Sequence, residues 1–232
     1  MSDLRFWRLY AGICMRSIAS MQTTTVPQAH FWNRIAPKYA ASPIADLAGY
    51  ERSIRRTRDL LSAQHDVLEV GCGTGTSALR LAPNTRSYLA TDLSPQMVAI
   101  AREKLLTQPV PQLRYDMADA DAEQAGPFDA VLAFNTLHLV PDLDRTVSRL
   151  KHMLKPGGLL ISKTACVGEM NRLIPWLALP VAQWIGKAPP VLVFKADHLL
   201  TAIERQGLHV DAVERHGTRG KDIRVFVIAR RP

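Results

Sequence analysis

The sequence predicts an α/β protein with a parallel, doubly wound sheet of seven strands, the last of which runs in reverse. Short apolar segments alternate with amphipathic helical segments along most of the chain, as in a parallel sheet built with helical crossovers. A short turn joins the final two apolar segments, so the last strand must run antiparallel to its neighbour. A length of 232 residues suits one domain of this kind.

Helical segments are indicated by apolar residues that recur every three or four positions. Phe31, Ile35 and Tyr39 recur every four residues in a segment that starts at residue 28 and is interrupted at Pro43. Ser94 followed by Pro95 is a typical helix start, with an N-cap residue and then a proline in the first turn. The predicted helices are residues 28–42, 47–61, 77–82, 95–106, 143–154 and 196–206.

Strands are indicated by short apolar runs bounded by polar residues or glycines. Residues 128–134 are almost wholly apolar, which is typical of a parallel strand buried on both faces. The predicted strands are residues 66–70, 87–91, 113–117, 128–134, 159–163, 209–214 and 223–229. We expect residues 1–27 to form an N-terminal extension and residues 28–232 to form the domain, with an apolar, proline-broken insertion at 166–195.

Composition and charge exclude several classes of protein. The net charge is +8, but residues 1–60 and 215–232 each carry +5 and the rest of the chain carries −2. A nucleic-acid-binding face usually gathers basic and aromatic residues together, so we expect no nucleic-acid partner. Three scattered cysteines indicate neither a disulfide framework nor a metal site, and they favour a reducing, cytoplasmic compartment. No apolar run reaches the ~18–20 residues that a membrane span needs.

A glycine-rich turn, EVGCGTG at residues 69–75, follows the first predicted strand and precedes a helix. Glycines let the backbone bend sharply and approach a ligand, and the helix start offers free N–H groups. Asp92 ends the next strand, where a carboxylate can accept hydrogen bonds from ribose hydroxyls. A dinucleotide site has the spacing G-x-G-x-x-G, whereas this turn has G-x-G-x-G, and Ser77 stands where a further glycine would fall. The Glu69 carboxylate suits a nucleoside ligand with a cationic end.

The chain resembles the class I S-adenosylmethionine-dependent methyltransferases over roughly residues 28–232. The resemblance rests on VLEVGCGTG (67–75), ATDLS (90–94), ADA (118–120), FDAVLAFNTLHLV (128–140), LKPGGLLI (154–161) and the terminal hairpin. It is strongest to the small-molecule group that includes quinone-biosynthesis C-methyltransferases and lipid N-methylating enzymes. It implies a Rossmann-like, seven-stranded sheet with a reversed last strand, and S-adenosyl-L-methionine as cofactor.

The resemblance also implies roles for individual residues. The turn residues Glu69, Gly71, Cys72 and Gly73 face the methionine moiety, and Gly75 completes the turn. The other implied contacts are the ribose-binding Asp92, the apolar adenine neighbours Leu93 and Met97, the adenine-recognising pair Asp119 and Ala120, Asn135 beneath the cofactor, and Tyr39 closing over it. Asp116 and Asp121 are alternatives to Asp119, which could instead cap a turn.

Methyl transfer from a sulfonium requires alignment of the reacting atoms and exclusion of water, and it needs a base only for a protonated nucleophile. His138 follows the fourth predicted strand and is the candidate base; the alternative is a histidine that only shapes the pocket. Residues 135–138, NTLH, lack the N/D-P-P-Y/F motif of base and amide N-methyltransferases. We therefore expect methylation of a small, hydrophobic or lipid-like acceptor. A nucleic-acid methyltransferase and a non-catalytic S-adenosylmethionine-binding module are the alternatives.

Two further segments bear on the acceptor. The insertion at 166–195 is more apolar than a surface connection should be, which predicts a lid over a hydrophobic acceptor; a homodimer interface or additional core is the alternative. The turn at 215–222 follows the sixth strand and lies on the ligand side of the sheet. Arg215, Arg219 and Lys221 are therefore predicted near the rim, where they would bind an anionic part of the acceptor or an anionic lipid surface.

Overall fold

The computed structural model describes residues 26–170, 173–174, 178–218 and 222–232. Almost all of the expected N-terminal extension, residues 1–27, therefore lies outside the described residues. Among the residues described, no helix is long and apolar enough to cross a membrane.

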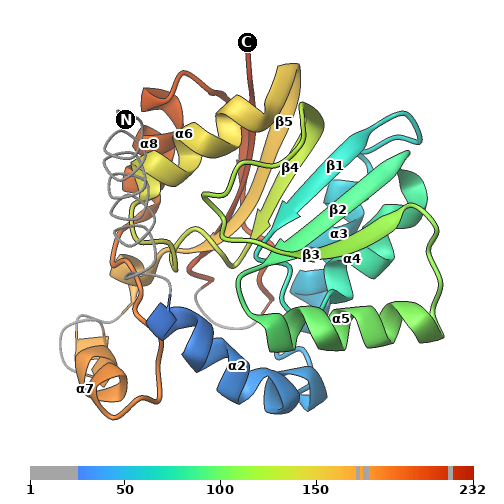
Figure 1. Ribbon diagram of the computed structural model, residues 1–232. Coiled ribbons are helices and arrows are strands. Elements are labelled where there is room, and N and C mark those ends of the chain that lie inside the picture. Colours follow the sequence, from blue (N-terminus) through green and yellow to red (C-terminus); the bar gives the residue numbers. More distant parts are fainter. Residues whose placement is uncertain (1–25, 171–172, 175–177, 219–221) are drawn as a thin grey trace, which may run out of the picture.

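In the described part of the chain, a central sheet of seven strands has the order β3-β2-β1-β4-β5-β7-β6 (Figure 1). Neighbouring strands from β3 to β5 pair in parallel, whereas β7 is antiparallel to both β5 and β6. This confirms the predicted sheet with its reversed last strand. The strands are β1 (Asp66–Val70), β2 (Ser87–Asp92), β3 (Leu113–Met117), β4 (Phe128–Phe134), β5 (Leu154–Ala165), β6 (His209–Glu214) and β7 (Arg224–Arg230).

Helices cover both faces of the sheet and give it two hydrophobic cores. One core joins the sheet to α6 and α8, through residues such as Leu150 and Ile203. The other joins it to α3, α4 and α5, through residues such as Ile54 and Leu81. The helices are α2 (Val26–Ala41), α3 (Leu47–Arg58), α4 (Thr76–Leu81), α5 (Pro95–Thr107), α6 (Leu143–Met153), α7 (Leu179–Trp184) and α8 (Ala196–Arg205), with short 3-10 turns η1 (Ala82–Asn84) and η2 (Val167–Glu169).

Side-chain caps set the starts of the helices that follow β2 and β4. Ser94 accepts a hydrogen bond from the Met97 N–H at 3.2 Å, and Pro95 is the first residue of α5, as the sequence predicts. Asp142 caps α6 by accepting from the Arg145 N–H at 3.0 Å. Both connections lie beyond the carboxyl ends of parallel strands, the edge of the sheet at which such folds bind ligands.

Strand β5 is longer than the sequence predicts. The prediction places a helix at 143–154 and a strand at 159–163, but β5 begins at Leu154. Leu154 pairs with Phe128, and the register then shifts so that Leu159 pairs with Ala130. The glycines are accommodated in this irregular pairing, where Gly157 has a φ of 78° and donates its N–H to the Arg231 carbonyl at 2.8 Å.

Candidate active site

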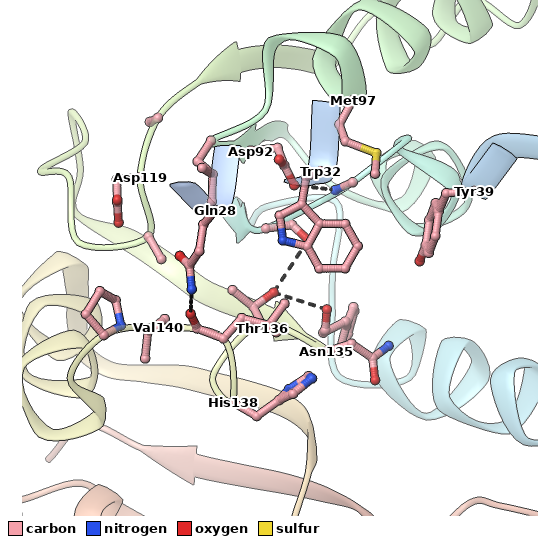
Figure 2. A pocket seen from close by; sticks show the side chains of 18 of the residues that line it. Gln28, Trp32, Tyr39, Asp92, Met97, Asp119, Asn135, Thr136, His138 and Val140 are labelled. Atoms are coloured by element: carbon pink, nitrogen blue, oxygen red, sulfur yellow. Dashed lines mark hydrogen bonds between the residues drawn. The ribbon is translucent and has the colours of Figure 1, made fainter. Parts of the chain in front are cut away.

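A cavity of about 320 Å³ lies at the carboxyl ends of the central strands, beneath α2 (Figure 2). Its volume is within the range of small-molecule sites. The strand-end loops of β1, β2, β3 and β4, the start of β7 and helix α2 all contribute to its walls. Its lining residues are Gln28, Trp32, Tyr39, Gly71, Gly73, Asp92, Leu93, Met97, Ala118, Asp119, Ala120, Phe134, Asn135, Thr136, His138, Leu139, Val140, Pro141 and Arg224.

The glycine turn after β1 is held in a conformation that side chains disfavour. Gly71 and Gly73 have φ values of 67° and 55°, in the left-handed region. A Cβ on Gly71 would lie 2.2 Å from the Thr136 hydroxyl oxygen, so the strand-end loops of β1 and β4 touch here. A Cβ on Gly73 would meet only the Tyr39 ring, at 3.9 Å. The turn therefore presents bare backbone to the cavity at Gly73, which a ligand can approach closely.

Asp92 joins this turn to the end of β2. Its carboxylate accepts hydrogen bonds from the Gly73 N–H at 2.8 Å and from the Ser94 N–H at 2.9 Å. The side chain is buried, and this burial raises its pKa, while the two N–H donors act in the opposite direction. Each carboxylate oxygen keeps a free lone pair, so Asp92 can also accept from the hydroxyls of a ligand.

The loop after β3 resolves the choice among the acidic residues there. Asp119 lines the cavity, and its carboxylate accepts the Asp121 N–H at 3.1 Å. Asp121 instead bonds to Thr146 and lies 3.3 Å from Arg145, whereas Asp116 is exposed and faces Arg102. Asp119 is thus the acid that a ligand can reach. Leu93, Met97 and Ala120 form the apolar wall around it, which agrees with their predicted place in the site.

Helix α2 closes the cavity and contributes residues that sequence reasoning missed. Gln28 donates its side-chain N–H to the Leu139 carbonyl, and Asn33 accepts from the Ser94 hydroxyl at 2.6 Å. Trp32 lies over the cavity with its ring centroid 6.3 Å from that of Tyr39, in an edge-to-face arrangement (Figure 2). The spacing of residues 28, 32 and 39 on one helix face is the signal that could have identified Gln28 and Trp32 alongside Tyr39.

The loop after β4 forms the far wall. Asn135 has a φ of 54°, and the Thr136 hydroxyl donates to the Val70 carbonyl at 3.1 Å. His138 lies away from Asp92 and Asp119 in Figure 2, and its Nδ1 is buried without a hydrogen-bond partner among the described residues. Burial lowers the pKa of His138 to about 4, so its imidazole is neutral at pH 7 and able to accept a proton.

Three residues predicted to contact the cofactor do not line the cavity: Glu69, Cys72 and Gly75. For Glu69, the predicted partner of a cationic ligand end, the structure shows contacts within the protein. Glu69 lies within β1, where its side chain is fully buried and accepts a 2.7 Å hydrogen bond from the Tyr88 hydroxyl. This burial raises the Glu69 pKa to about 7. Cys72 packs into the core, and Gly75 is the N-cap residue of α4 and lies against the Tyr115 hydroxyl.

The predicted basic rim after β6 is only partly described. Arg215 is engaged within the protein, because it bonds to the Glu169 carboxylate at 2.9 Å and to the Asp222 carbonyl. Arg219 and Lys221 lie outside the described residues. The basic residue that does line the cavity is Arg224, at the start of β7, which the sequence analysis does not single out. Among the described residues, no cluster of His, Cys, Asp or Glu side chains could hold a metal ion.

Comparisons with known proteins agree with this geometry. Residues 68–160 match a family model described as a methyltransferase domain. Curated relatives include ubiquinone biosynthesis O-methyltransferases from Xanthomonas axonopodis pv. citri (37% identical, covering 53% of this chain and 52% of the relative) and from Xylella fastidiosa (39%, covering 53% and 50%). The chain spans about half the length of these curated relatives.

The fold is shared with solved methyltransferases. The N-methyltransferase NodS from Bradyrhizobium japonicum, in complex with S-adenosyl-L-homocysteine, superposes with a TM-score of 0.65 at 17% identity over 87% of this chain and 98% of NodS. The residues present fit S-adenosylmethionine, since bare backbone at Gly73, the carboxylates of Asp92 and Asp119 and an apolar wall all meet in one cavity. Over residues 68–160 the chain therefore matches a methyltransferase domain, and its described residues share the fold of solved S-adenosylmethionine-dependent methyltransferases.

Proposed function

We propose that this protein methylates a hydroxyl oxygen on a small hydrophobic acceptor that contains an aromatic ring. The observation that carries the proposal is His138, a neutral imidazole in the wall of the cavity whose Nδ1 has no partner among the described residues. A hydroxyl nucleophile must lose its proton, and a positioned base is the group that this step requires. The name of the relatives, ubiquinone biosynthesis O-methyltransferase, supports an oxygen on a quinone-related ring.

The cofactor supplies a methyl group carried on a sulfonium. In the proposed arrangement, Asp92 accepts hydrogen bonds from the ribose hydroxyls and Asp119 accepts one from the adenine amino group. The backbone of Gly71 and Gly73 faces the methionine part, and Met97 with Leu93 packs against the adenine. Trp32 and Tyr39 on α2 cover the site and exclude water from it, which favours in-line transfer.

His138 receives the proton of the acceptor hydroxyl. The acceptor oxygen forms a bond to the methyl carbon while the carbon–sulfur bond breaks and its electron pair stays on sulfur. The hydroxyl proton passes to the imidazole and then to water, so atoms and charge balance.

The insertion at 166–195 is proposed to cover the acceptor. Its backbone reaches the site directly, because the Leu192 N–H donates to the His138 carbonyl at 2.8 Å, and Arg34 on α2 bonds to the Gly186 carbonyl. Its described part exposes several large apolar side chains, which suits contact with a hydrophobic acceptor. They are Leu173, Ile174, Val181, Trp184, Ile185 and Val193.

Incubation of the purified chain with methyl-tritiated S-adenosylmethionine and catechol tests the proposal. We expect label on the catechol oxygen, and we expect His138→Gln to lower kcat by about 10² to 10⁴ without changing the Kd for S-adenosylhomocysteine. Protonation of His138 should not affect kcat above about pH 5, because the pKa of His138 is about 4.

His65 is the matched control, since its Nδ1 is also buried without a partner among the described residues, but it precedes β1 at the opposite edge of the sheet. His65→Gln should leave kcat unchanged. Transfer of label to added DNA or RNA, but not to catechol, would contradict the proposal. A His138→Gln variant with full activity would contradict it too.

A further inference from the structure

The acidic and the basic residues that line the cavity lie on different sides of it. Asp92 and Asp119 follow β2 and β3, whereas Arg224 begins β7 at the other side of the sheet. Strands lie about 4.8 Å apart, and β7 stands three positions from β1 in the sheet order, so its backbone is about 14 Å from that of the glycine turn. Arg224 therefore lies beyond the region assigned to the cofactor and borders the space left for the acceptor.

Arg224 has hydrogen-bonding capacity to spare. Its Nε lies 3.3 Å from Asp222 Oδ1, and within the described ranges Nη1 and Nη2 have no hydrogen-bond partner. A guanidinium carries five N–H donors in a planar fork, so four of them remain for a ligand. The side chain is 36% exposed although its neighbour Asp222 is only 7% exposed, which leaves the arginine the accessible member of the pair.

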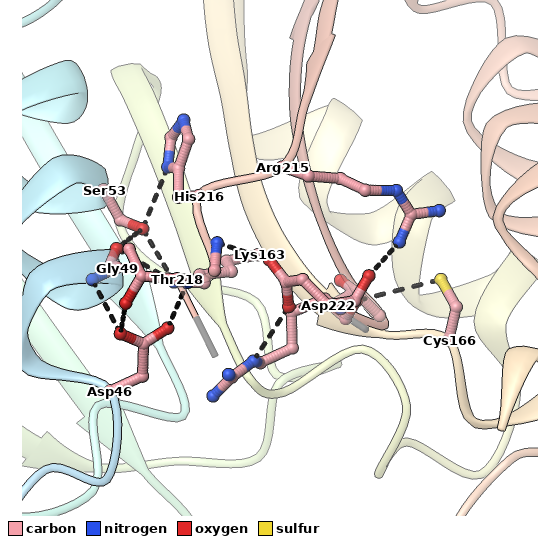
Figure 3. A network of polar contacts seen from close by, with 12 residues as sticks. Asp46, Gly49, Ser53, Lys163, Cys166, Arg215, His216, Thr218 and Asp222 are labelled. Carbon is pink, nitrogen blue, oxygen red and sulfur yellow. Dashed lines mark hydrogen bonds and ion pairs between the residues drawn. The ribbon is translucent and has the colours of Figure 1, made fainter. Parts of the chain in front are cut away.

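Asp222 contacts only the Nε of the Arg224 guanidinium, and the aspartate has other donors. Its carboxylate also accepts the Gly217 N–H at 2.6 Å and the Arg224 N–H at 3.0 Å, so it is occupied in holding the turn between β6 and β7 (Figure 3). The Arg224 guanidinium thus keeps a face that carries positive charge and is not covered by its own counter-ion.

A second cation lies behind Arg224. Lys163, at the end of β5, is buried and donates to the Ser53 hydroxyl at 2.8 Å and to the Gly49 carbonyl at 3.4 Å (Figure 3). It forms no ion pair with a described carboxylate. Burial, and after it the charge of Arg224, lowers the Lys163 pKa, whereas Asp222 and Asp46 raise it. Asp46 is itself saturated by Thr218 and the Gly49 N–H. An anion on the acceptor would relieve this repulsion between cations.

We infer that the Arg224 guanidinium binds a carboxylate group on the acceptor through its free Nη1 and Nη2 donors. The inference rests on the proposed function, because it assigns a chemical class to the acceptor of the same site. A carboxylate fits the guanidinium fork in two parallel hydrogen bonds, which also fixes the direction of the ring that carries it. Arg224 is on this account a specificity-determining residue, and the acceptor is a hydroxylated aromatic acid.

Calorimetric titration of the full chain saturated with S-adenosylhomocysteine tests the inference. The probes are 3,4-dihydroxybenzoate and catechol, which differ only in the carboxylate. We expect the wild-type chain to bind the carboxylated probe at least about tenfold more tightly, and Arg224→Gln to abolish that preference without changing the Kd for catechol. The control is Arg230→Gln at the opposite end of β7, where Arg230 is paired with Asp211 at 2.8 Å; it should behave as wild type.

Three results would overturn the inference. In the first, Arg224→Gln still prefers 3,4-dihydroxybenzoate to catechol. In the second, the wild-type chain shows no such preference or binds neither probe. In the third, Arg224→Gln has a raised Kd for S-adenosylhomocysteine itself. The last result would assign Arg224 to the carboxylate of the cofactor. If Arg224→Gln does not fold, Arg224→Lys tests the inference instead, because lysine keeps the positive charge but lacks the two parallel guanidinium donors. A preference reduced at least about threefold supports the inference, and an unchanged one overturns it.

Binding and turnover separate the two proposals. If the carboxylated probe binds through Arg224 but neither probe is methylated, the proposed O-methylation fails while the recognition by Arg224 stands. If catechol is methylated and the carboxylate brings no gain in affinity, the O-methylation stands and the recognition fails.

Discussion

The two halves of the cavity differ in how their polar groups are satisfied. On the side of β1, β2 and β3, Asp92 and the glycine turn hold each other through backbone hydrogen bonds. On the side of β4, β5 and β7, His138 Nδ1 and the Arg224 terminal nitrogens have no partners among the described residues. In the half proposed for the cofactor, the polar groups are therefore held in place by the protein, although Asp92 keeps lone pairs for a ligand. In the half proposed for the acceptor, the Arg224 terminal nitrogens remain open to a ligand.

The extent of the family match follows this division only in part. The matched residues, 68–160, include the glycine turn, Asp92, Asp119 and His138, but they end within β5. The insertion, β6 and β7 lie beyond them, and so does Arg224. Arg224 therefore lies outside the matched residues, whereas His138 lies inside them. The following substitutions test whether the two halves behave independently.

The largest effect is expected from Gly71→Ala in the cofactor half. The new Cβ would lie 2.2 Å from the Thr136 hydroxyl oxygen at a φ of 67°. Overpacking costs about 1–3 kcal/mol and left-handed backbone about 1–2 kcal/mol, so we expect the Kd for S-adenosylhomocysteine to rise about a hundredfold, with a lower Tm. Gly157→Ala is the control, because its φ is 78° but nothing lies within 4 Å. Equal behaviour of the two variants would contradict the close contact between the β1 and β4 loops.

A pH-dependent effect is expected from Glu69, which lies beneath the cofactor half. Its pKa is about 7 in the folded chain against 4.5 ordinarily, so the folded state holds a proton that the unfolded chain releases. The contribution of Glu69 to the free energy of unfolding is therefore fully present below about pH 4.5, and it is lost as the pH rises through 7. We expect Glu69→Gln to be more stable than wild type at pH 8 by up to about 3 kcal/mol, and little changed at pH 4.5.

Urea denaturation at pH 4.5 and pH 8 measures this difference. Glu103→Gln, at an exposed position on α5, is the control and should follow wild type at both values. If Glu69→Gln kept the wild-type dependence on pH, Glu69 would not be the buried protonated group described above.

Sequence reasoning identifies the fold, and most of the residues that it predicts for the cofactor line the cavity, for physical reasons. The seven strands are apolar runs with clear boundaries, and the turn, Asp92 and Asp119 follow strand ends directly, so local position determines where they lie. The role of Glu69 is harder to predict, because a residue two positions before the turn still belongs to the strand. Its side chain alternates with those of Leu68 and Val70 and enters the layer beside the sheet instead of the cavity.

The acceptor half is hidden from the sequence because tertiary structure assembles it. Arg224 stands next to Asp222 after a polar turn, and in sequence alone such a pair looks like an exposed ion pair. Only the antiparallel pairing of β7 with β5 brings Arg224 beside Ala165 at the ligand edge. The predicted rim residue Arg215 has the same charge, but its bonds to Glu169 and Asp222 occupy it.

A moderate effect is expected from Asp92→Asn. The amide retains one acceptor oxygen, but its NH₂ group would face an N–H donor, either that of Gly73 or that of Ser94. Loss of a charged hydrogen bond should raise the Kd for S-adenosylhomocysteine by about tenfold. Asp116→Asn, at the exposed end of β3, is the control and should bind normally. An unchanged Kd for Asp92→Asn would refute the ribose contact proposed for Asp92 while leaving the acceptor half untouched.

The smallest effect is expected from Trp184→Ala in the insertion. Trp184 is 88% exposed on α7, so its removal should change stability by no more than about 0.5 kcal/mol. If the insertion covers an apolar acceptor, the KM for 4-tert-butylcatechol should rise about fivefold, as expected for losing about 1 kcal/mol of apolar contact, and the KM for catechol should not. Leu106→Ala, 82% exposed on α5, is the control and should change neither value. Sedimentation of the same variant distinguishes the alternatives: a change from dimer to monomer with both KM values unchanged would make this surface a subunit interface, and the acceptor half would then lack its proposed cover.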